Sequence, residues 1–142
     1  MRADPSSPEP RALIVEDEIL IAEELKERLS YLGFSVIAAV DSAEEGIEIA
    51  IRERPDLILM DIRLKGEKDG AQAAKEIRQQ VDVPIVYVTA YSDLLTVDHA
   101  RQTEHDGYIL KPFLGRELQP TIDVARQRHA LRRSRNNSFS DI

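Results

Sequence analysis

Short apolar runs alternate with helical stretches along most of the chain. The apolar runs cover Ala12–Val15, Phe34–Val40, Asp56–Met60, Ile85–Thr89 and Gly107–Leu110. Runs of this length, bounded by polar residues and proline, predict β-strands. Because a helical stretch follows each strand, the pattern predicts βαβ units. The expected fold class is therefore α/β, a doubly wound parallel sheet with helices on both faces.

The helical stretches carry apolar residues at spacings of three and four positions. The first is expected over Ile19–Leu32, with Gly33 as its C-terminal cap. Ser42 followed by Glu45 is the pattern of a capping box and opens the second. Pro120 must lie in the first turn of the last helix or kink that helix. The remaining helices are expected over 71–80, over 92–104 and around Leu118, Ile122 and Ala125.

Length and composition narrow the class of protein. The chain has 142 residues, enough for one domain, with 42% hydrophobic and 32% charged residues. It has no cysteine, which excludes disulfides and cysteine-bound zinc and fits a cytoplasmic location. No apolar run is long enough to predict a membrane span or a signal peptide. The net charge of −7 argues against general nucleic-acid binding.

Reactive side chains follow four of the five predicted strands. Glu16 and Asp17 follow the first, Asp61 the third and Lys111 the fifth, and Thr89 ends the fourth. The carboxyl ends of parallel strands meet at one edge of a sheet, where ligands bind. Two carboxylates about 4 Å apart repel by roughly 4 kcal/mol at an effective dielectric of about 20, so we expect Mg²⁺ between them. A carboxylate nucleophile, a cation and a hydroxyl suit in-line phosphoryl transfer.

Each of these residues alone is a weak signal. An acid after a strand is often a helix cap, and a single lysine is most often solvated. Their joint order is more specific. With the stretches ALIVEDE, DLILMDIRL, PIVYVTAYSD and GYILKPF, the sequence resembles the receiver domains of two-component response regulators over about residues 11–128. The resemblance implies a flavodoxin-like sheet in the order 2-1-3-4-5, flanked by five helices.

The resemblance also assigns roles in phosphoryl transfer. Asp61 is the expected phosphoacceptor, and Lys111 is expected to pair with the phosphoryl group. For Mg²⁺, Asp17 and Asp61 are expected as direct ligands, Glu16 through a water and Arg63 through its backbone carbonyl. The pair Glu-Asp replaces the commoner Asp-Asp of the family. A water between Glu16 and the metal can accommodate the extra methylene of the glutamate.

Further expectations concern the response to phosphorylation. Thr89 matches the switch hydroxyl that turns toward the phosphoryl group, and Tyr108 matches the aromatic side chain that moves with it. The Lys111–Pro112 peptide bond is expected to be cis. Arg63 and Tyr91 each lie two residues beyond a site residue, and we predict that their bulk slows loss of the phosphoryl group.

The resemblance implies partners and a regulatory function. The phosphodonor is expected to be a sensor histidine kinase or a phosphotransfer protein, and a homodimer through the fourth helix, fifth strand and fifth helix is possible. The chain is expected to be a regulatory phosphoacceptor rather than an enzyme that turns over a metabolite. The alternative is an interaction module that works without phosphorylation. A flavodoxin lacks support because VEDE would repel a flavin phosphate, and an aspartyl phosphatase would need Asp-x-Asp after the first strand.

The two ends of the chain differ from its centre. Residues 1–10 contain three prolines and two serines and predict a disordered leader. Residues 129–142 predict a basic tail or the start of a connecting helix. The arginines there are either a solvated helix end or a contact for an acidic partner. Too few residues follow Arg128 for a DNA-binding domain, so the chain is either a stand-alone receiver or part of a longer protein.

Overall fold

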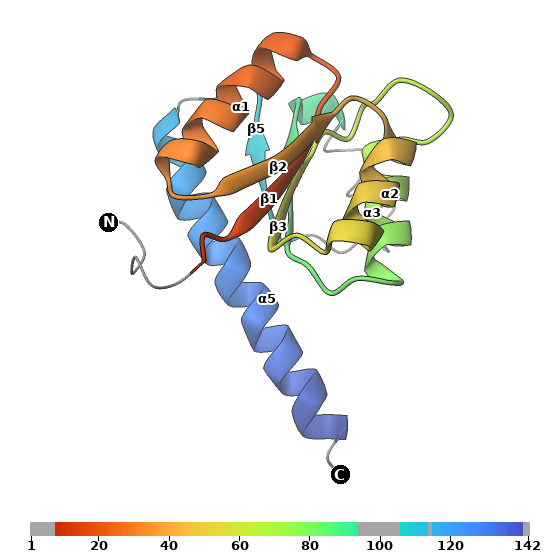
Figure 1. The fold of residues 1–142 in the computed structure, drawn as a ribbon, viewed down its shortest axis with the longest axis vertical. Coiled ribbons are helices and arrows are strands. Elements are labelled where there is room, and N and C mark those ends of the chain that lie inside the picture. Colours follow the sequence, from red (N-terminus) through yellow and green to blue (C-terminus); the bar gives the residue numbers. More distant parts are fainter. Residues whose placement is uncertain (1–7, 94–105, 114, 141–142) are drawn as a thin grey trace.

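The computed structural model describes residues 8–93, 106–113 and 115–140, and the side chains of these ranges up to residue 135. Its centre is a parallel five-stranded sheet in the order β2-β1-β3-β4-β5 (Figure 1). This order confirms the predicted fold class. The strands are β1 (Arg11–Val15), β2 (Ser35–Val40), β3 (Leu57–Met60), β4 (Ile85–Thr89) and β5 (Gly107–Leu110).

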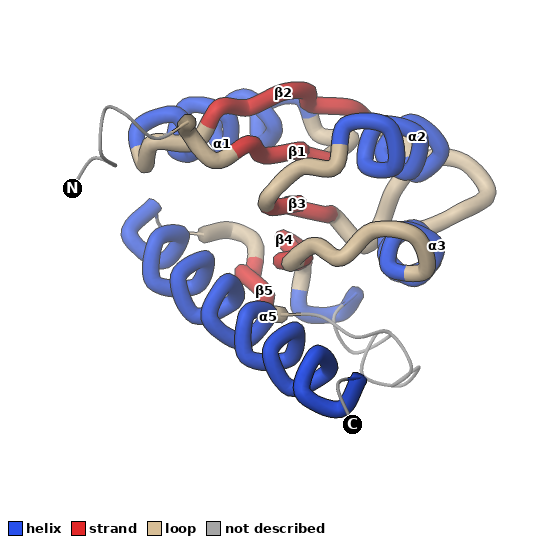
Figure 2. Tube along the Cα trace, turned by 60° about the horizontal axis from the view of Figure 1, so that its bottom comes forward, coloured by secondary structure: helices blue, strands red, loops and turns tan. Residues whose placement is uncertain are grey.

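Helices cover both faces of the sheet, as Figure 2 shows. On one face lie α1 (Ile19–Tyr31) and α5 (Leu118–Ser140), and on the other α2 (Ala43–Glu53) and α3 (Gly70–Arg78). A 3₁₀ turn, η1 (Gly115–Glu117), precedes α5. The helix expected over 92–104 lies mostly outside the described residues. Residues 91–93, which are described, are helical.

The central strands contribute side chains alternately to two apolar cores. In β3, for example, Leu57 and Leu59 pack with α1 and α5, whereas Ile58 and Met60 pack with α2 and α3. All four residues of β3 are buried, as a strand covered on both faces requires. This double burial explains why the strand reads as a continuous apolar run rather than as an alternating pattern.

Local hydrogen bonds set where the helices begin and end. Gly33 has φ +95°, and the N–H of Phe34 donates to the carbonyl of Leu29 (3.0 Å), so α1 ends in a Schellman motif with glycine as expected. Asp69 and Gln72 form a full capping box that starts α3 at Gly70, one residue earlier than predicted.

The other two helix starts also follow from short-range chemistry. At α2, the Ser42 hydroxyl accepts the N–H of Glu45 (3.2 Å) and donates to the Glu45 carboxylate (3.1 Å). The glutamate therefore contacts the serine side chain rather than the backbone N–H of a full capping box. At α5, Pro120 is the third residue of the helix and lies in its first turn, where no intrahelical bond from its nitrogen is needed.

The last helix is longer than its contact with the sheet. Its buried apolar residues end at Ala125, but α5 runs without a break to Ser140 and extends past the sheet (Figure 1). None of the helices in the described part of the chain combines the length and apolar character that a membrane crossing needs.

Candidate functional site

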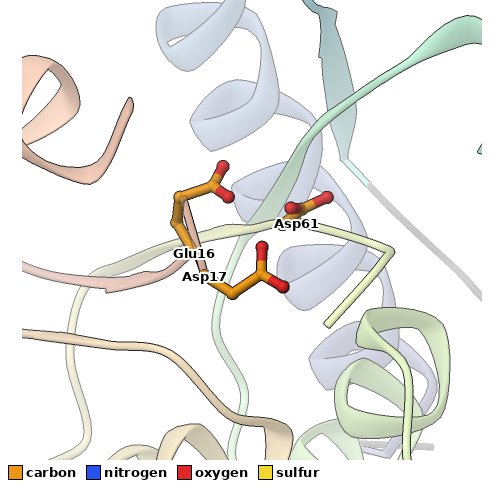
Figure 3. A group of neighbouring side chains, drawn as sticks. All are labelled: Glu16, Asp17 and Asp61. Carbon is orange, nitrogen blue, oxygen red and sulfur yellow. The ribbon is translucent and has the colours of Figure 1, made fainter. Parts of the chain in front are cut away.

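The carboxylates expected from the sequence converge at the carboxyl edge of the sheet. Val15 pairs with Met60 across β1 and β3, so the residues that follow them emerge side by side. The N–H of Asp61 donates to the carbonyl of Val15 (2.9 Å), which fixes this position. Oxygens of Glu16, Asp17 and Asp61 lie within 4.8 Å of one another, and Figure 3 shows the three carboxylates close together.

Lys111 reaches the same point from the end of β5. Its N–H donates to the carbonyl of Thr89 (2.8 Å), which holds the start of the β5–α5 loop against β4. Its Nζ lies 2.9 Å from Glu16 Oε1, 3.1 Å from Asp61 Oδ2 and 2.9 Å from Glu18 Oε2. The peptide bond from Lys111 to Pro112 is cis.

Burial changes the acid–base properties of this cluster. Glu16 and Asp61 are each only 3% exposed. Burial, together with hydrogen bonding to Asp61, raises the pKa of Glu16 to about 8, against the effect of Lys111. Burial by itself lowers the pKa of Lys111. Hydrogen bonds to Glu16 and Glu18 and the charge of Asp61 outweigh this effect, so the net result is a raised pKa.

The donor set fits Mg²⁺. A hollow of about 390 Å³, which we call the acidic pocket, opens at the cluster. Its lining residues are Asp17, Glu18, Asp61, Arg63, Lys65, Ala90, Asp93 and Lys111. Mg²⁺ is a hard cation that prefers oxygen ligands, here the carboxylates. It also keeps several waters and binds phosphate, for which the hollow leaves space.

Three other predicted residues lie in different environments, and of these only Arg63 lines the acidic pocket. The N–H of Arg63 donates to Asp61 Oδ1 (3.2 Å), and its guanidinium pairs with Asp93 (3.0 Å). Thr89 is fully buried, and its hydroxyl makes no hydrogen bond within the described part of the chain. Tyr108 is 45% exposed on β5. The metal contact of the Arg63 carbonyl and the switch roles of the other two stay predictions.

Sequence reasoning missed two carboxylates of this site. Glu18 binds Lys111, although no role was predicted for it from the sequence. Asp93 holds the Arg63 side chain beside the acidic pocket. The run of three acids in VEDE was the available signal for Glu18. Nothing in the sequence pairs residue 63 with residue 93, since their contact depends on how the loops after β3 and β4 lie.

The geometry agrees with a comparison of the sequence with protein-family models. The model of the response regulator receiver domain matches residues 12–123. The chain belongs to this family. The resemblance noted in the sequence is thereby confirmed, and with it the assignment to two-component signalling proteins.

Relatives of this receiver include transcriptional regulators. The transcriptional regulatory protein PdtaR of Mycobacterium tuberculosis (strain CDC 1551 / Oshkosh) is 37% identical over 115 residues, which cover 81% of this chain and 56% of PdtaR. The probable transcriptional regulator ycf27 of Porphyridium aerugineum is 38% identical over 127 residues, 89% of this chain and 52% of that protein. The chain therefore spans about half the length of these curated relatives.

Solved receiver structures share the fold. The signal receiver domain of a modulated diguanylate cyclase from Desulfovibrio desulfuricans G20 superposes with a TM-score of 0.80 and 34% identity, covering 88% of this chain and 99% of that one. The receiver domain of the sensor histidine kinase PA1611 from Pseudomonas aeruginosa PAO1 has a TM-score of 0.75 and 32% identity, covering 84% and 99%. The latter holds a magnesium ion in its active-site cleft.

Proposed function

We propose that this receiver takes a phosphoryl group onto Asp61 from a phosphohistidine of a sensor histidine kinase or phosphotransfer protein. The observation that carries the proposal is the position of Asp61. Its carboxylate lies beside the acidic pocket, 3.1 Å from the Lys111 ammonium and within 4.8 Å of oxygens of Glu16 and Asp17. A buried carboxylate with one cation beside it and open space in front of it suits nucleophilic attack.

The transfer conserves the phosphoryl group. A carboxylate oxygen of Asp61 attacks phosphorus, the bond from phosphorus to the donor imidazole nitrogen breaks, and that nitrogen keeps the electron pair. The product is an acyl phosphate. Water then attacks phosphorus, the bond to the Asp61 oxygen breaks, and the carboxylate and inorganic phosphate are released. The protein thus promotes only its own phosphorylation and dephosphorylation and is a regulatory phosphoacceptor, not a metabolic enzyme.

The side chains around Asp61 have different roles in this reaction. Glu16, Asp17 and Asp61 would hold Mg²⁺, which when bound offsets negative charge on the transferring phosphoryl group. Lys111, whose Nζ lies 3.1 Å from Asp61 Oδ2, supplies a second positive charge beside the attacking carboxylate. The presence of magnesium in the active-site cleft of the PA1611 receiver supports this metal requirement by similarity.

Phosphorylation then changes the surface that partners bind. The Thr89 hydroxyl, buried and without a hydrogen-bond partner among the described residues, gains one when it turns to the acyl phosphate. Tyr108, which lies on β5 beside β4, follows and shifts the population of the surface that partners bind. We place this exchange in the cytoplasm. A homodimer through the predicted fourth helix, β5 and α5 stays a prediction.

Acetyl phosphate, a small phosphodonor, tests the proposal. The purified chain is incubated with it in the presence and absence of Mg²⁺, and the intact mass is measured. The expected result is one added phosphoryl group that requires Mg²⁺ and is absent in Asp61→Asn. Failure of the unmodified chain to gain mass with acetyl phosphate, and also with a phosphorylated phosphotransfer protein, would overturn the proposal and favour an interaction module that works without phosphorylation.

A further inference from the structure

Lys111 is shared among three carboxylates, and only two of them have a place in the proposed transfer. Glu16 and Asp61 are buried beside the metal-binding oxygens. The third carboxylate, that of Glu18, lies equally close, 2.9 Å from Nζ. Its side chain is 59% exposed at the rim of the acidic pocket. Glu18 therefore has access both to Lys111 and to solvent.

The position of Glu18 in the sequence does not account for this contact. Glu18 is the N-cap residue of α1, where a carboxylate usually accepts a backbone N–H of the first turn. Its side chain makes no such bond. Its backbone N–H instead donates to Glu16 Oε2 (3.1 Å), which draws the two residues together and leaves the Glu18 carboxylate directed to Lys111.

In this arrangement the ammonium already donates hydrogen bonds to two carboxylates, those of Glu18 and Asp61. A lysine has three N–H groups, and three carboxylates surround Nζ of Lys111. A phosphoryl oxygen on Asp61 must compete with these carboxylates for the ammonium. Glu18 is the one that water can solvate at once, because its side chain is 59% exposed, whereas the Glu16 side chain is buried against Nζ.

We propose that Glu18 is a positioning residue that holds Lys111 in the resting receiver and opposes formation of the phosphorylated state. The inference rests on the proposed phosphorylation of Asp61 and assigns a regulator to that site. Loss of the Glu18 charge frees one donor of Lys111 for the phosphoryl group. It also removes a negative charge from the rim that an anionic donor must pass.

Glu18→Gln tests this role, with Glu23→Gln as the matched control. Glu23 is exposed on the same helix and its replacement changes the net charge equally, but it does not line the acidic pocket. At saturating Mg²⁺, Glu18→Gln should be phosphorylated by acetyl phosphate about fivefold faster than Glu23→Gln, the ratio expected for one exposed ion pair. In a Lys111→Ala background the two substitutions should have equal effects.

A measurement without any phosphodonor tests the contact itself. The ¹³Cε resonance of Lys111, assigned with Lys111→Arg, should shift in Glu18→Gln and stay in place in Glu23→Gln. An unchanged resonance in Glu18→Gln overturns the contact. Equal or slower phosphorylation of Glu18→Gln, or an acceleration that persists in Lys111→Ala, overturns the opposing role. A chain that no donor phosphorylates overturns the proposed function, and the opposing role with it, while the resonance still reports whether the contact exists.

Discussion

At the residue scale, Glu16 links the acidic pocket to the stability of the fold. Burial and the hydrogen bond to Asp61 raise its pKa from 4.5 to about 8. Between these values the folded protein keeps a proton that the unfolded chain releases. The free energy of unfolding of the metal-free protein is therefore expected to be highest below about pH 4.5. It should fall as the pH rises from there through about 8.

Urea denaturation in the presence of a chelator, at several pH values across this window, measures the slope. Glu16→Gln cannot ionise at this position and should flatten the dependence. A slope of the same size in Glu16→Gln would show that another group is responsible.

Arg63 and Tyr91 are expected to control how long the phosphoryl group persists. The Arg63 side chain lines the acidic pocket and is held by Asp93, while Tyr91 is 62% exposed. Replacement of either residue by alanine opens a path for the attacking water, so the half-life of the phosphorylated protein should shorten by less than about tenfold in each case. Arg116→Ala, an exposed arginine outside the acidic pocket, is the control.

The decay is followed by intact mass after removal of the phosphodonor. An unchanged or longer half-life in both variants would contradict a shielding role for these side chains.

The residues of the site differ in how far the sequence could predict them. Asp61 stands out because a carboxylate directly follows four buried apolar residues. Lys111 stands out because a lysine followed by proline ends the last strand. The contact of Glu18 with Lys111 joins residues 93 positions apart, and no periodicity encodes it. Contacts of exposed side chains depend on loop geometry, which only the folded chain specifies.

At the element scale, the start of α3 supports the loop that carries Asp61. The N–H of Gly70 donates to the carbonyl of Ile62 (2.6 Å). A Cβ at this position would lie 1.9 Å from the backbone oxygen of Asp61, closer than any two such atoms can approach. The helix therefore packs directly on the backbone of Asp61, the proposed phosphoacceptor, and only glycine permits this distance.

Gly70→Ala is expected to lower the free energy of unfolding by about 1–3 kcal/mol or more, because backbone must move to admit the methyl group. Gly107→Ala is the matched control, since its Cβ would meet side-chain and backbone atoms no closer than 3.4 Å. Urea denaturation compares the two. Equal stability of both variants would contradict the close packing of α3 on the Asp61 loop.

The elements themselves were largely predictable. The strands β4 and β5 have the expected bounds, because Pro84 and Gly107 mark their starts and the apolar runs mark their lengths. The strands β2 and β3 each begin one residue later than predicted. The end of α5 could not be read from apolar periodicity, since the residues that hold its second half are charged.

At the scale of the whole molecule, the two edges of the sheet carry different groups of charged residues. The carboxyl edge carries the acidic pocket. At the amino edge, Asp106 is completely buried and binds Arg78 (2.7 Å), the N–H of Ile85 (2.8 Å) and Arg132 of α5. His129 (2.7 Å) and Arg133 (3.5 Å) contact Asp82 nearby. The contacts made by His129, Arg132 and Arg133 hold α5 against the sheet beyond its last buried apolar residue.

Arg132→Ala is expected to lower the free energy of unfolding by about 1–2 kcal/mol, because a buried carboxylate loses one of its partners while Arg78 remains. Arg135→Ala, an exposed arginine on the same helix, should have little effect. In an Asp106→Asn background the cost of Arg132→Ala should shrink, as measured by urea denaturation. Equal costs in both backgrounds would show that the pair does not stabilise the fold.

The identity of the phosphorylated residue is the most direct test of the proposed role of Asp61. The chain is phosphorylated with acetyl phosphate and Mg²⁺, the acyl phosphate is reduced with borohydride, and the modified peptide is located by mass spectrometry. Asp61 alone should be converted to homoserine, and the conversion should depend on both the phosphodonor and Mg²⁺. Reduction at another carboxylate, or at none in a chain that has gained a phosphoryl group, would contradict this role.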